Sequence, residues 1–211
     1  MWAVRFLLLF SATACASGRT GNMGSCFFVS PSGLVLTSLH VVKNARRISV
    51  IDSVGHRSRA KILEQDERLD LAMMEARDFD APAVLPVADN DAVLGDHVVA
   101  IRVLLSGPQV TEGSIVEQHA LGMEFLLGTS AQVERGSSGG PLVNEHGEVV
   151  GVMTKRRDAP SGEAAKLSFA VKSSSARKAF RRLPIERNAT PIDRRDAIDR
   201  AQRASCMIFA R

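Results

Sequence analysis

Short runs rich in Val, Ile, Leu and Phe alternate with turn-forming residues along most of this chain. Such runs are typical of all-β proteins, because these side chains suit a half-buried pleated surface. Turn signals such as Ser30-Pro31-Ser32-Gly33 and Asn144-Glu145-His146-Gly147 separate neighbouring runs. The strands we expect are 26–30, 34–38, 48–52, 58–63, 71–75, 97–103, 109–118, 123–129, 141–144, 149–154 and 167–171.

The segment Gly136-Ser137-Ser138-Gly139-Gly140-Pro141-Leu142 places a serine among three glycines, directly before one of these runs. Glycines at such a turn let a substrate and an oxyanion approach main-chain N–H groups closely. A flexible loop is the usual reading of a Gly-Ser string, but the flanking strands and the Gly-Gly-Pro-Leu ending disfavour it. Ser138 is therefore a candidate nucleophile, which would need a base and a group that orients the base.

Two upstream residues supply that base and orienting group. His40 ends the run that begins at Leu34, and Asp70 opens the apolar run Asp70-Leu71-Ala72-Met73-Met74. A carboxylate beside apolar residues needs a polar partner, and His40 would be that partner for Asp70. Asp66 competes for the role, but its charged neighbours indicate a solvated loop. The order His, Asp, Ser is the chain order of the serine-hydrolase triad in the chymotrypsin fold.

The residues themselves resemble a known family, the trypsin-fold proteases of the HtrA (Deg) group, over roughly residues 24–180. The segments that carry the resemblance are Gly24–Val29, Gly33–Thr37, His40–Val42, Asp70–Ala72, Gly95–Ile101 and Gly136–Leu142. The resemblance implies an all-β fold of two packed six-stranded antiparallel β-barrels with a C-terminal helix. It also implies a His40, Asp70, Ser138 triad and an oxyanion hole made by the backbone N–H groups of Gly136 and Ser138.

The domain organisation expected from this resemblance has one protease domain at 22–183. It divides into barrel one at 22–80, a linker at 81–94, barrel two at 95–172 and a helix at 173–183. Residues 1–21 would be a signal peptide or the first strand of barrel one, which otherwise lacks a strand. Residues 184–211 would form a basic, weakly ordered tail, too short for the PDZ domain that many HtrA-group proteins carry.

Alignment outward from Ser138 suggests a specificity pocket. Gln132 and Val133 would form one wall, Leu167 and Ser168 would lie opposite, and Thr154-Lys155-Arg156 would pair with the substrate backbone. Nothing at the pocket base is acidic, so we expect cleavage after small or medium apolar residues rather than after Lys or Arg.

The chain departs from the family pattern at three places. Cys26 stands where glycine is usual, Arg102-Val103-Leu104-Leu105 replaces a Gly-Asn-Pro turn, and Glu134-Arg135 replaces Asn-Pro before Gly136. The last change bears on the resting geometry of the oxyanion loop.

The positive charge of the chain is concentrated near its C-terminus. Residues 172–211 hold 11 Lys and Arg against 4 Asp and Glu, a net charge of +7, whereas the whole chain carries +4. The remainder shows no stripe of basic and aromatic residues, which argues against nucleic-acid binding. The helix-prone piece 193–204 could still dock against a barrel through Ile198 and Ala201. Cys206 could pair with Cys26 in an oxidising compartment.

The N-terminal segment allows two interpretations. Arg5, the apolar stretch 6–10 and the small residues around Cys15 fit a secretory signal, with Cys15 as a possible lipidation site. Residues 4–10 could instead be the missing strand of barrel one, which would suit a cytoplasmic protein. No segment approaches the roughly 18 apolar residues that span a bilayer.

The function expected from the sequence is a serine endopeptidase that acts on proteins or peptides through an acyl-enzyme intermediate. The proposed chemistry needs no metal or cofactor, and the cysteines and histidines show no metal-ligand spacing. The alternative is a catalytically inactive trypsin-fold module that binds peptides or partners.

Overall fold

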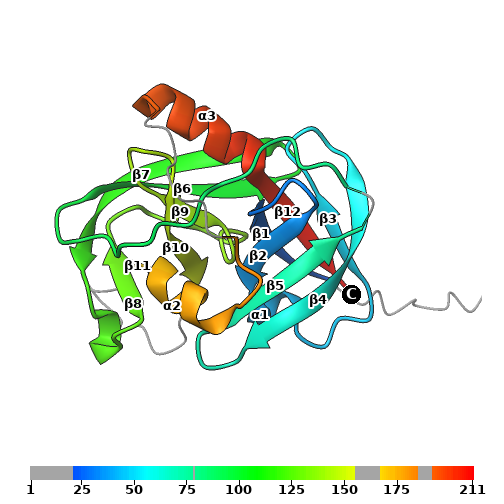
Figure 1. Cartoon of the computed structure of the whole chain (residues 1–211), viewed down its shortest axis with the longest axis horizontal. Helices are drawn as coiled ribbons and strands as arrows, with labels where there is room; N and C mark the ends of the chain where they lie inside the picture. The colour runs from blue at the N-terminus through cyan, green and yellow to red at the C-terminus, as the bar shows by residue number, and fades with distance from the viewer. Residues whose placement is uncertain (1–20, 78, 155–166, 185–191) are drawn as a thin grey trace, which may run out of the picture.

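Two closed antiparallel β-barrels lie side by side in the computed structural model, which describes residues 21–77, 79–154, 167–184 and 192–211 (Figure 1). Barrel one has the strand order β1-β12-β3-β4-β5-β2, and barrel two has the order β10-β11-β8-β7-β6-β9. The expected fold of two six-stranded barrels with a helix near the C-terminus is therefore confirmed. None of the helices in the described ranges is long and apolar enough to cross a membrane.

Every strand expected from the sequence overlaps an observed strand. In barrel one the elements are β1 (Asn22–Phe28), β2 (Leu34–Ser38), α1 (Leu39–Val42), β3 (Ile48–Ile51), β4 (Arg57–Asp66), β5 (Leu71–Ala76) and, from the far end of the chain, β12 (Ser205–Ala210). In barrel two they are β6 (His97–Leu104), β7 (Gly107–Glu117), η1 (Ala120–Gly122), β8 (Leu126–Thr129), β9 (Pro141–Val143), β10 (Val149–Thr154) and β11 (Ser168–Lys172). The helices α2 (Ser173–Ala179) and α3 (Arg194–Ala204) follow barrel two in the chain.

The prediction of a weakly ordered tail is wrong for residues 192–211. The segment Ser205–Ala210 forms β12, which lies between β1 and β3 and closes barrel one. Cys206 pairs with Cys26 in register and forms a disulfide with it. Residues 205–210 are ordered because apolar side chains such as Ile208 complete the core of barrel one, a long-range effect that local composition does not reveal. Residues 4–10, the strand proposed from the sequence for this barrel, lie outside the described residues.

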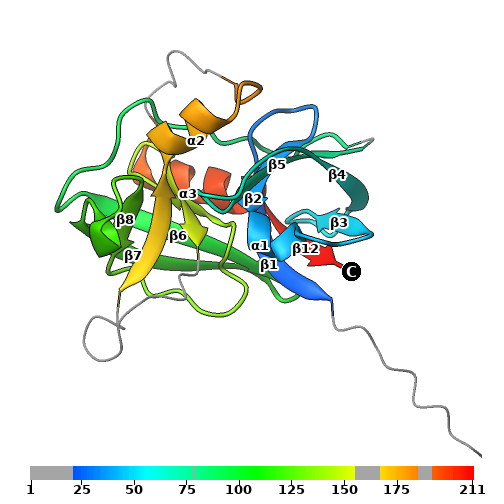
Figure 2. The same cartoon turned by 90° about the horizontal axis from the view of Figure 1, so that it is seen from below.

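Helix α3 docks on barrel two and brings the chain back to barrel one (Figures 1 and 2). Asp193 caps the helix by accepting a hydrogen bond from the Asp196 N–H at 2.9 Å. Ala197 and Ala201 are buried, and Ile198 packs against the main core. The structure therefore confirms the expectation that segment 193–204 docks against a barrel through Ile198 and Ala201.

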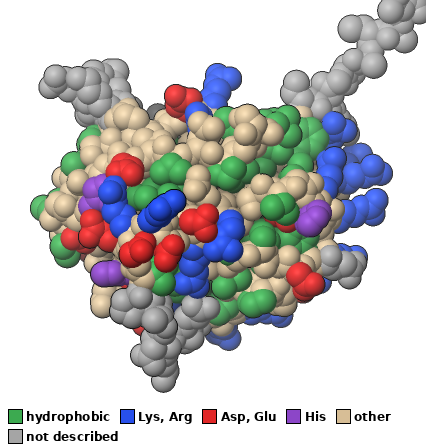
Figure 3. Space-filling model, turned by 90° about the horizontal axis from the view of Figure 1, so that it is seen from above, with side chains coloured by type: hydrophobic (Ala, Val, Ile, Leu, Met, Phe, Trp, Pro, Cys, Tyr) green, Lys and Arg blue, Asp and Glu red, His purple; other side chains and the backbone are tan. Residues whose placement is uncertain are grey.

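The positive charge of this C-terminal region is partly paired with acidic residues of the barrels. Arg194 contacts Glu112 of β7, Arg177 lies 3.2 Å from Asp89, and Arg182 lies 3.6 Å from Glu64. Figure 3 shows acidic and basic side chains interspersed on the face seen from above, with Lys and Arg gathered at one end. The described residues of this region are therefore part of the fold rather than a free basic appendage.

Three buried clusters hold the molecule together. One fills barrel one around Phe28 and Met74, another fills barrel two around Leu127 and Leu142, and the third contains residues of both barrels. The third cluster joins Phe27 and other barrel-one side chains to residues of β6, β9, β10 and β11. Burial of apolar surface at about 25 cal/mol per Å² drives this packing. It fixes the two barrels against each other, and the candidate site uses residues of both.

Candidate active site

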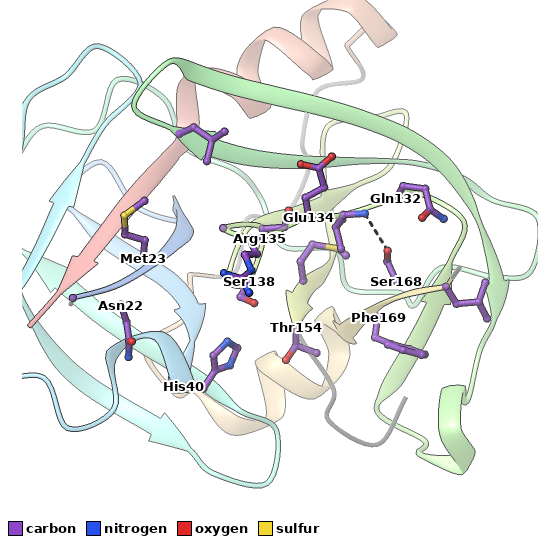
Figure 4. Close-up of a pocket in the computed structure, with 17 residues that line it drawn as sticks. Asn22, Met23, His40, Gln132, Glu134, Arg135, Ser138, Thr154, Ser168 and Phe169 are labelled. Atoms are coloured by element: carbon purple, nitrogen blue, oxygen red, sulfur yellow. Dashed lines mark hydrogen bonds between the residues drawn. The ribbon is translucent and has the colours of Figure 1, made fainter. Parts of the chain in front are cut away.

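A pocket of about 780 Å³ is lined by residues of both barrels. Barrel one contributes His40, Asn22 and Met23, and barrel two contributes the turn that carries Ser138 together with parts of β10 and β11. Figure 4 shows Ser138 in the middle of this pocket, between His40 on one side and Ser168 and Phe169 on the other. A histidine and a serine predicted to react together thus face the same cavity.

Strand pairing brings His40 and Asp70 together. Strands β2 and β5 are antiparallel with Ser38 opposite Leu71, so the residues after β2 and before β5 meet at one end of the barrel. The Leu39 N–H donates to the Asp70 carbonyl at 2.8 Å, and the His40 N–H donates to Asp70 Oδ1 at 2.8 Å. Asp70 has a φ of 57°, a conformation that costs energy for a residue with a side chain. The aspartate is therefore held in an unusual backbone geometry that aims its carboxylate at the histidine.

The carboxylate of Asp70 contacts the imidazole directly. Asp70 Oδ2 lies 2.6 Å from His40 Nδ1 and also accepts a hydrogen bond from Thr154 Oγ1 at 3.0 Å. With Nδ1–H donating to the carboxylate, Nε2 carries the lone pair that can accept a proton. Asp66, the competing carboxylate, instead accepts a hydrogen bond from the Leu69 N–H at 2.9 Å. Asp70, not Asp66, is the carboxylate in contact with His40.

Ser138 sits on a tightly bonded turn between β8 and β9. The Ser25 N–H of β1 donates to the Ser138 carbonyl at 2.9 Å, and the Gly139 N–H donates to the Met153 carbonyl at 2.7 Å. Gly139 has a φ of 86°, and a Cβ there would lie 2.1 Å from Thr37 Oγ1, so only glycine fits. Ser137 is buried, whereas Ser138 is half-buried and reaches the pocket. This turn can therefore present the Ser138 hydroxyl to a substrate.

The amides of Gly136 and Ser138 are candidates for an oxyanion hole. Gly136 has a φ of 94° and lines the pocket, as does Ser138. Neither N–H donates a hydrogen bond to another described residue. Two backbone donors in one pocket lining, left unbonded by the described residues, are candidates because preorganised N–H groups stabilise a developing oxyanion.

Most of the residues expected to form the specificity pocket line the observed cavity. Gln132, Val133, Thr154, Leu167 and Ser168 all line the cavity, and Ser168 Oγ accepts a hydrogen bond from the Val133 N–H at 3.2 Å. The other two expected residues, Lys155 and Arg156, lie outside the described residues.

The structure adds lining residues that the sequence reasoning missed. Met23 and Leu104 line the side of the pocket near β1 and β6, and Phe169 lies on the side of β11. Phe169 follows Ser168 directly, so a strand alignment could have included it. Met23 and Leu104 carry no motif, because their place depends on how the barrels meet. Glu134 is the one acidic residue among the described residues that line the cavity.

Comparisons with known proteins agree with this architecture. A family model for the trypsin-like peptidase domain matches residues 24–152. The periplasmic pH-dependent serine endoprotease DegQ of Escherichia coli K12 is 31% identical over 164 residues, covering 74% of this chain and 36% of DegQ. The periplasmic serine endoprotease DegP of the same strain is 33% identical over 182 residues, covering 78% of this chain and 38% of DegP.

A solved structure is similar as well. The crystal structure of a serine endoprotease from Yersinia pestis matches with a TM-score of 0.62 and 31% identity, covering 74% of this chain and 56% of that chain. The match to this chain spans little more than a third of the length of DegQ and of DegP.

Proposed function

Because this chain belongs to the trypsin-like peptidase family, we propose that it is a serine endopeptidase in which His40, Asp70 and Ser138 form the catalytic triad. The observation that carries the proposal is the 2.6 Å contact between His40 and Asp70 beside a pocket that His40 shares with Ser138. An oriented histidine and a serine on a glycine-rich turn are the parts that acyl transfer requires.

In the proposed reaction the Ser138 hydroxyl attacks a peptide carbonyl while His40 Nε2 takes its proton. The carbonyl oxygen becomes an oxyanion that the N–H groups of Gly136 and Ser138 stabilise. His40 then returns the proton to the leaving amine, and an acyl-enzyme on Ser138 Oγ remains. Water, activated by the same histidine, hydrolyses that ester and releases the second product. Asp70 stays ionised throughout and stabilises the imidazolium.

The pocket supports a preference for small or medium apolar side chains before the cleaved bond. Val133, Leu167 and Phe169 supply apolar lining near Ser168, whereas trypsin-like recognition of Lys or Arg uses an acidic pocket base. The one acidic residue that lines the described part of the pocket, Glu134, has its carboxylate 2.8 Å from Arg102 Nη1, so its charge is paired. Profiling with a peptide library tests this part, and a dominant Lys or Arg preference would contradict it.

The disulfide supports a place of action outside the cytoplasm. Cys26 and Cys206 are bonded, and disulfides persist mainly in oxidising compartments. The relatives DegQ and DegP are named as periplasmic. We therefore include the periplasm or another extracytoplasmic compartment in the proposal.

The test of the proposed function is reaction with a fluorophosphonate probe together with hydrolysis of casein. Wild-type protein should be labelled at Ser138 and should cleave casein, and Ser138→Ala should lose both activities while it keeps its melting temperature. Ser137→Ala is the matched control and should keep most of the activity. Cleavage that persists in pure Ser138→Ala protein would refute the assignment. A folded wild-type protein that is neither labelled nor active would favour a non-catalytic binding module.

A further inference from the structure

The turn before Ser138 is held by side chains from outside it. We call residues Glu134–Gly136 the oxyanion turn, since Gly136 supplies one candidate oxyanion donor. The Ser137 N–H closes this turn by donating to the Glu134 carbonyl at 3.1 Å. Side chains of other elements bind two carbonyls of this turn. One is the Arg135 carbonyl, which precedes the Gly136 N–H, and the other is the carbonyl of Gly136 itself.

Arg102 of β6 holds the first of these carbonyls. Its Nη1 donates to the Arg135 carbonyl at 3.3 Å and lies 2.8 Å from Glu134 Oε2. The Arg102 side chain is only 19% exposed, whereas that of Glu134 is 75% exposed. An arginine guanidinium offers several donors in a planar fork, so one head group can bind a carboxylate and a carbonyl together.

Ser25 of β1 holds the second carbonyl. Its hydroxyl donates to the Gly136 carbonyl at 2.7 Å and accepts from the Val103 N–H at 2.9 Å. Ser25 is fully buried, so its hydroxyl has no access to water as an alternative partner. This single side chain connects barrel one, the end of β6 and the oxyanion turn.

The direction of the Gly136 N–H follows from the first contact. In a trans peptide the C=O of one residue and the N–H of the next point in opposite directions, and the described chain has no cis peptide. The Arg135 carbonyl points to Arg102, which does not line the pocket, while Gly136 does. Holding that carbonyl therefore holds the Gly136 N–H on the opposite side. Glycine allows many backbone conformations, so without such contacts this peptide can rotate.

The two residues of the ion pair are both departures from the HtrA-group pattern. Arg102 belongs to the segment Arg102–Leu105 that replaces a Gly-Asn-Pro turn, and Glu134 belongs to the pair that replaces Asn-Pro. A proline restricts the backbone of its own residue and of the residue before it. In this chain the restriction is absent, and an ion pair connects the two altered segments instead.

We propose that Arg102 and Ser25 are positioning residues for the oxyanion turn: Arg102 fixes the peptide between Arg135 and Gly136 with its N–H available to the oxyanion, and Ser25 fixes the next peptide, on the other side of the Gly136 α-carbon. Glu134 orients Arg102 for this role. The inference rests on the proposed endopeptidase function, because it assigns these residues to the same site. It predicts an effect on the transition state and little effect on binding of the intact substrate.

The experiment measures kcat and KM for a chromogenic peptide with an apolar residue before the cleaved bond, and the inhibition constant of the matching peptide boronic acid. Arg102→Gln should lower kcat by about tenfold to hundredfold with KM changed less than threefold, because a complete oxyanion donor is worth about 10²–10³ in kcat. The boronic acid, which mimics the tetrahedral intermediate, should bind more weakly by a similar factor. Ser25→Ala should show the same split between kcat and KM.

The matched control is Arg177→Gln. Arg177 is also largely buried, donates to the Ala88 carbonyl at 3.1 Å and lies 3.2 Å from Asp89, but it does not line the pocket. This variant should lower the melting temperature and leave kcat and the boronic acid affinity within about twofold of wild type. Arg102→Lys keeps the charge opposite Glu134 but not the planar fork, so it should lie between wild type and Arg102→Gln. If Arg102→Gln does not fold, Arg102→Lys replaces it as the variant that tests the positioning role.

The outcomes separate the two proposals. Folded Arg102 variants with wild-type kcat and boronic acid affinity would overturn the positioning role, while the loss of activity in Ser138→Ala would leave the proposed function standing. A parallel fall of kcat in Arg177→Gln would also overturn it, since any loss of stability would then suffice. A wild-type protein that neither turns over the peptide nor reacts with the phosphonate would overturn the proposed function and the positioning role together.

Discussion

Removing the disulfide between Cys26 and Cys206 should destabilise the protein strongly. The bond joins β1 to β12 across a sequence separation of 180 residues. For a loop of this length, the chain-entropy relation gives a stabilisation of about 5 kcal/mol, at the upper end of the 2–5 kcal/mol typical of native disulfides. Both cysteines are fully buried, so the variant Cys26→Ala/Cys206→Ala also loses some packing. We therefore expect the cost to reach several kcal/mol.

Thermal unfolding measures this effect. In a domain of this size each kcal/mol shifts the melting temperature by about 2–4 °C, so the expected fall is about 10–20 °C. Wild-type protein should melt lower with a reductant than without it, and the double alanine variant should be indifferent to the reductant. Thiol titration in denaturant should find two more reactive cysteines after reduction than before it, those of Cys26 and Cys206. A fully reduced wild type that melts within 2 °C of the oxidised form, which corresponds to about 1 kcal/mol or less, would refute the reasoning.

Three further outcomes follow from the contacts described above. A chain truncated after Pro184 loses β12 and opens barrel one, so it should lose cooperative unfolding by circular dichroism; a native-like melt would contradict the role of β12. Asp70→Asn should lower kcat by about 10⁴-fold through the wrong histidine tautomer, whereas Asp66→Asn should lower it less than tenfold; equal losses would reassign the carboxylate. Lys61, by its hydrogen bond and its charge, lowers the pKa of Glu75 below 4.5, so Lys61→Ala should raise that pKa in an NMR titration. The stabilisation from this pair is present above pH 4.5 and is lost as the pH falls through the lowered pKa of Glu75; an unchanged pKa would exclude Lys61 as the cause.

Most of the strands and the residues of the candidate triad could be predicted from the sequence. A strand such as Val149–Thr154 is a compact apolar run bounded by turn residues, so its position depends on local composition. The turn at Gly136–Leu142 was recognisable from its glycines, whereas the contacts that require glycine at Gly139, such as that with Thr37, come from the other barrel. Asp70 was recognisable because a carboxylate that adjoins an apolar run needs a polar partner, and His40 because its sequence context resembles the motif of the HtrA group.

The close approach of His40 and Asp70, in contrast, depends on the register of β2 and β5. A shift of that pairing by one residue would turn the side chains to the other face of the sheet. The ion pair between Arg102 and Glu134 also depends on tertiary structure. In the sequence each residue is only a departure from the family pattern, and the two become partners because β6 lies beside the oxyanion turn.

The segment Ser205–Ala210 marks the boundary between what sequence and tertiary structure determine here. Its run Ser-Cys-Met-Ile-Phe-Ala has the composition of a strand, yet nothing local says which barrel it would enter. That choice depends on the unpaired edges of β1 and β3, which lie on either side of β12 in barrel one, and on helix α3, which carries the chain back to them. The sequence by itself determined the local elements and the reactive residue types. The tertiary structure decided which distant residues meet, because strand pairing and burial are satisfied across the whole molecule and not within a segment.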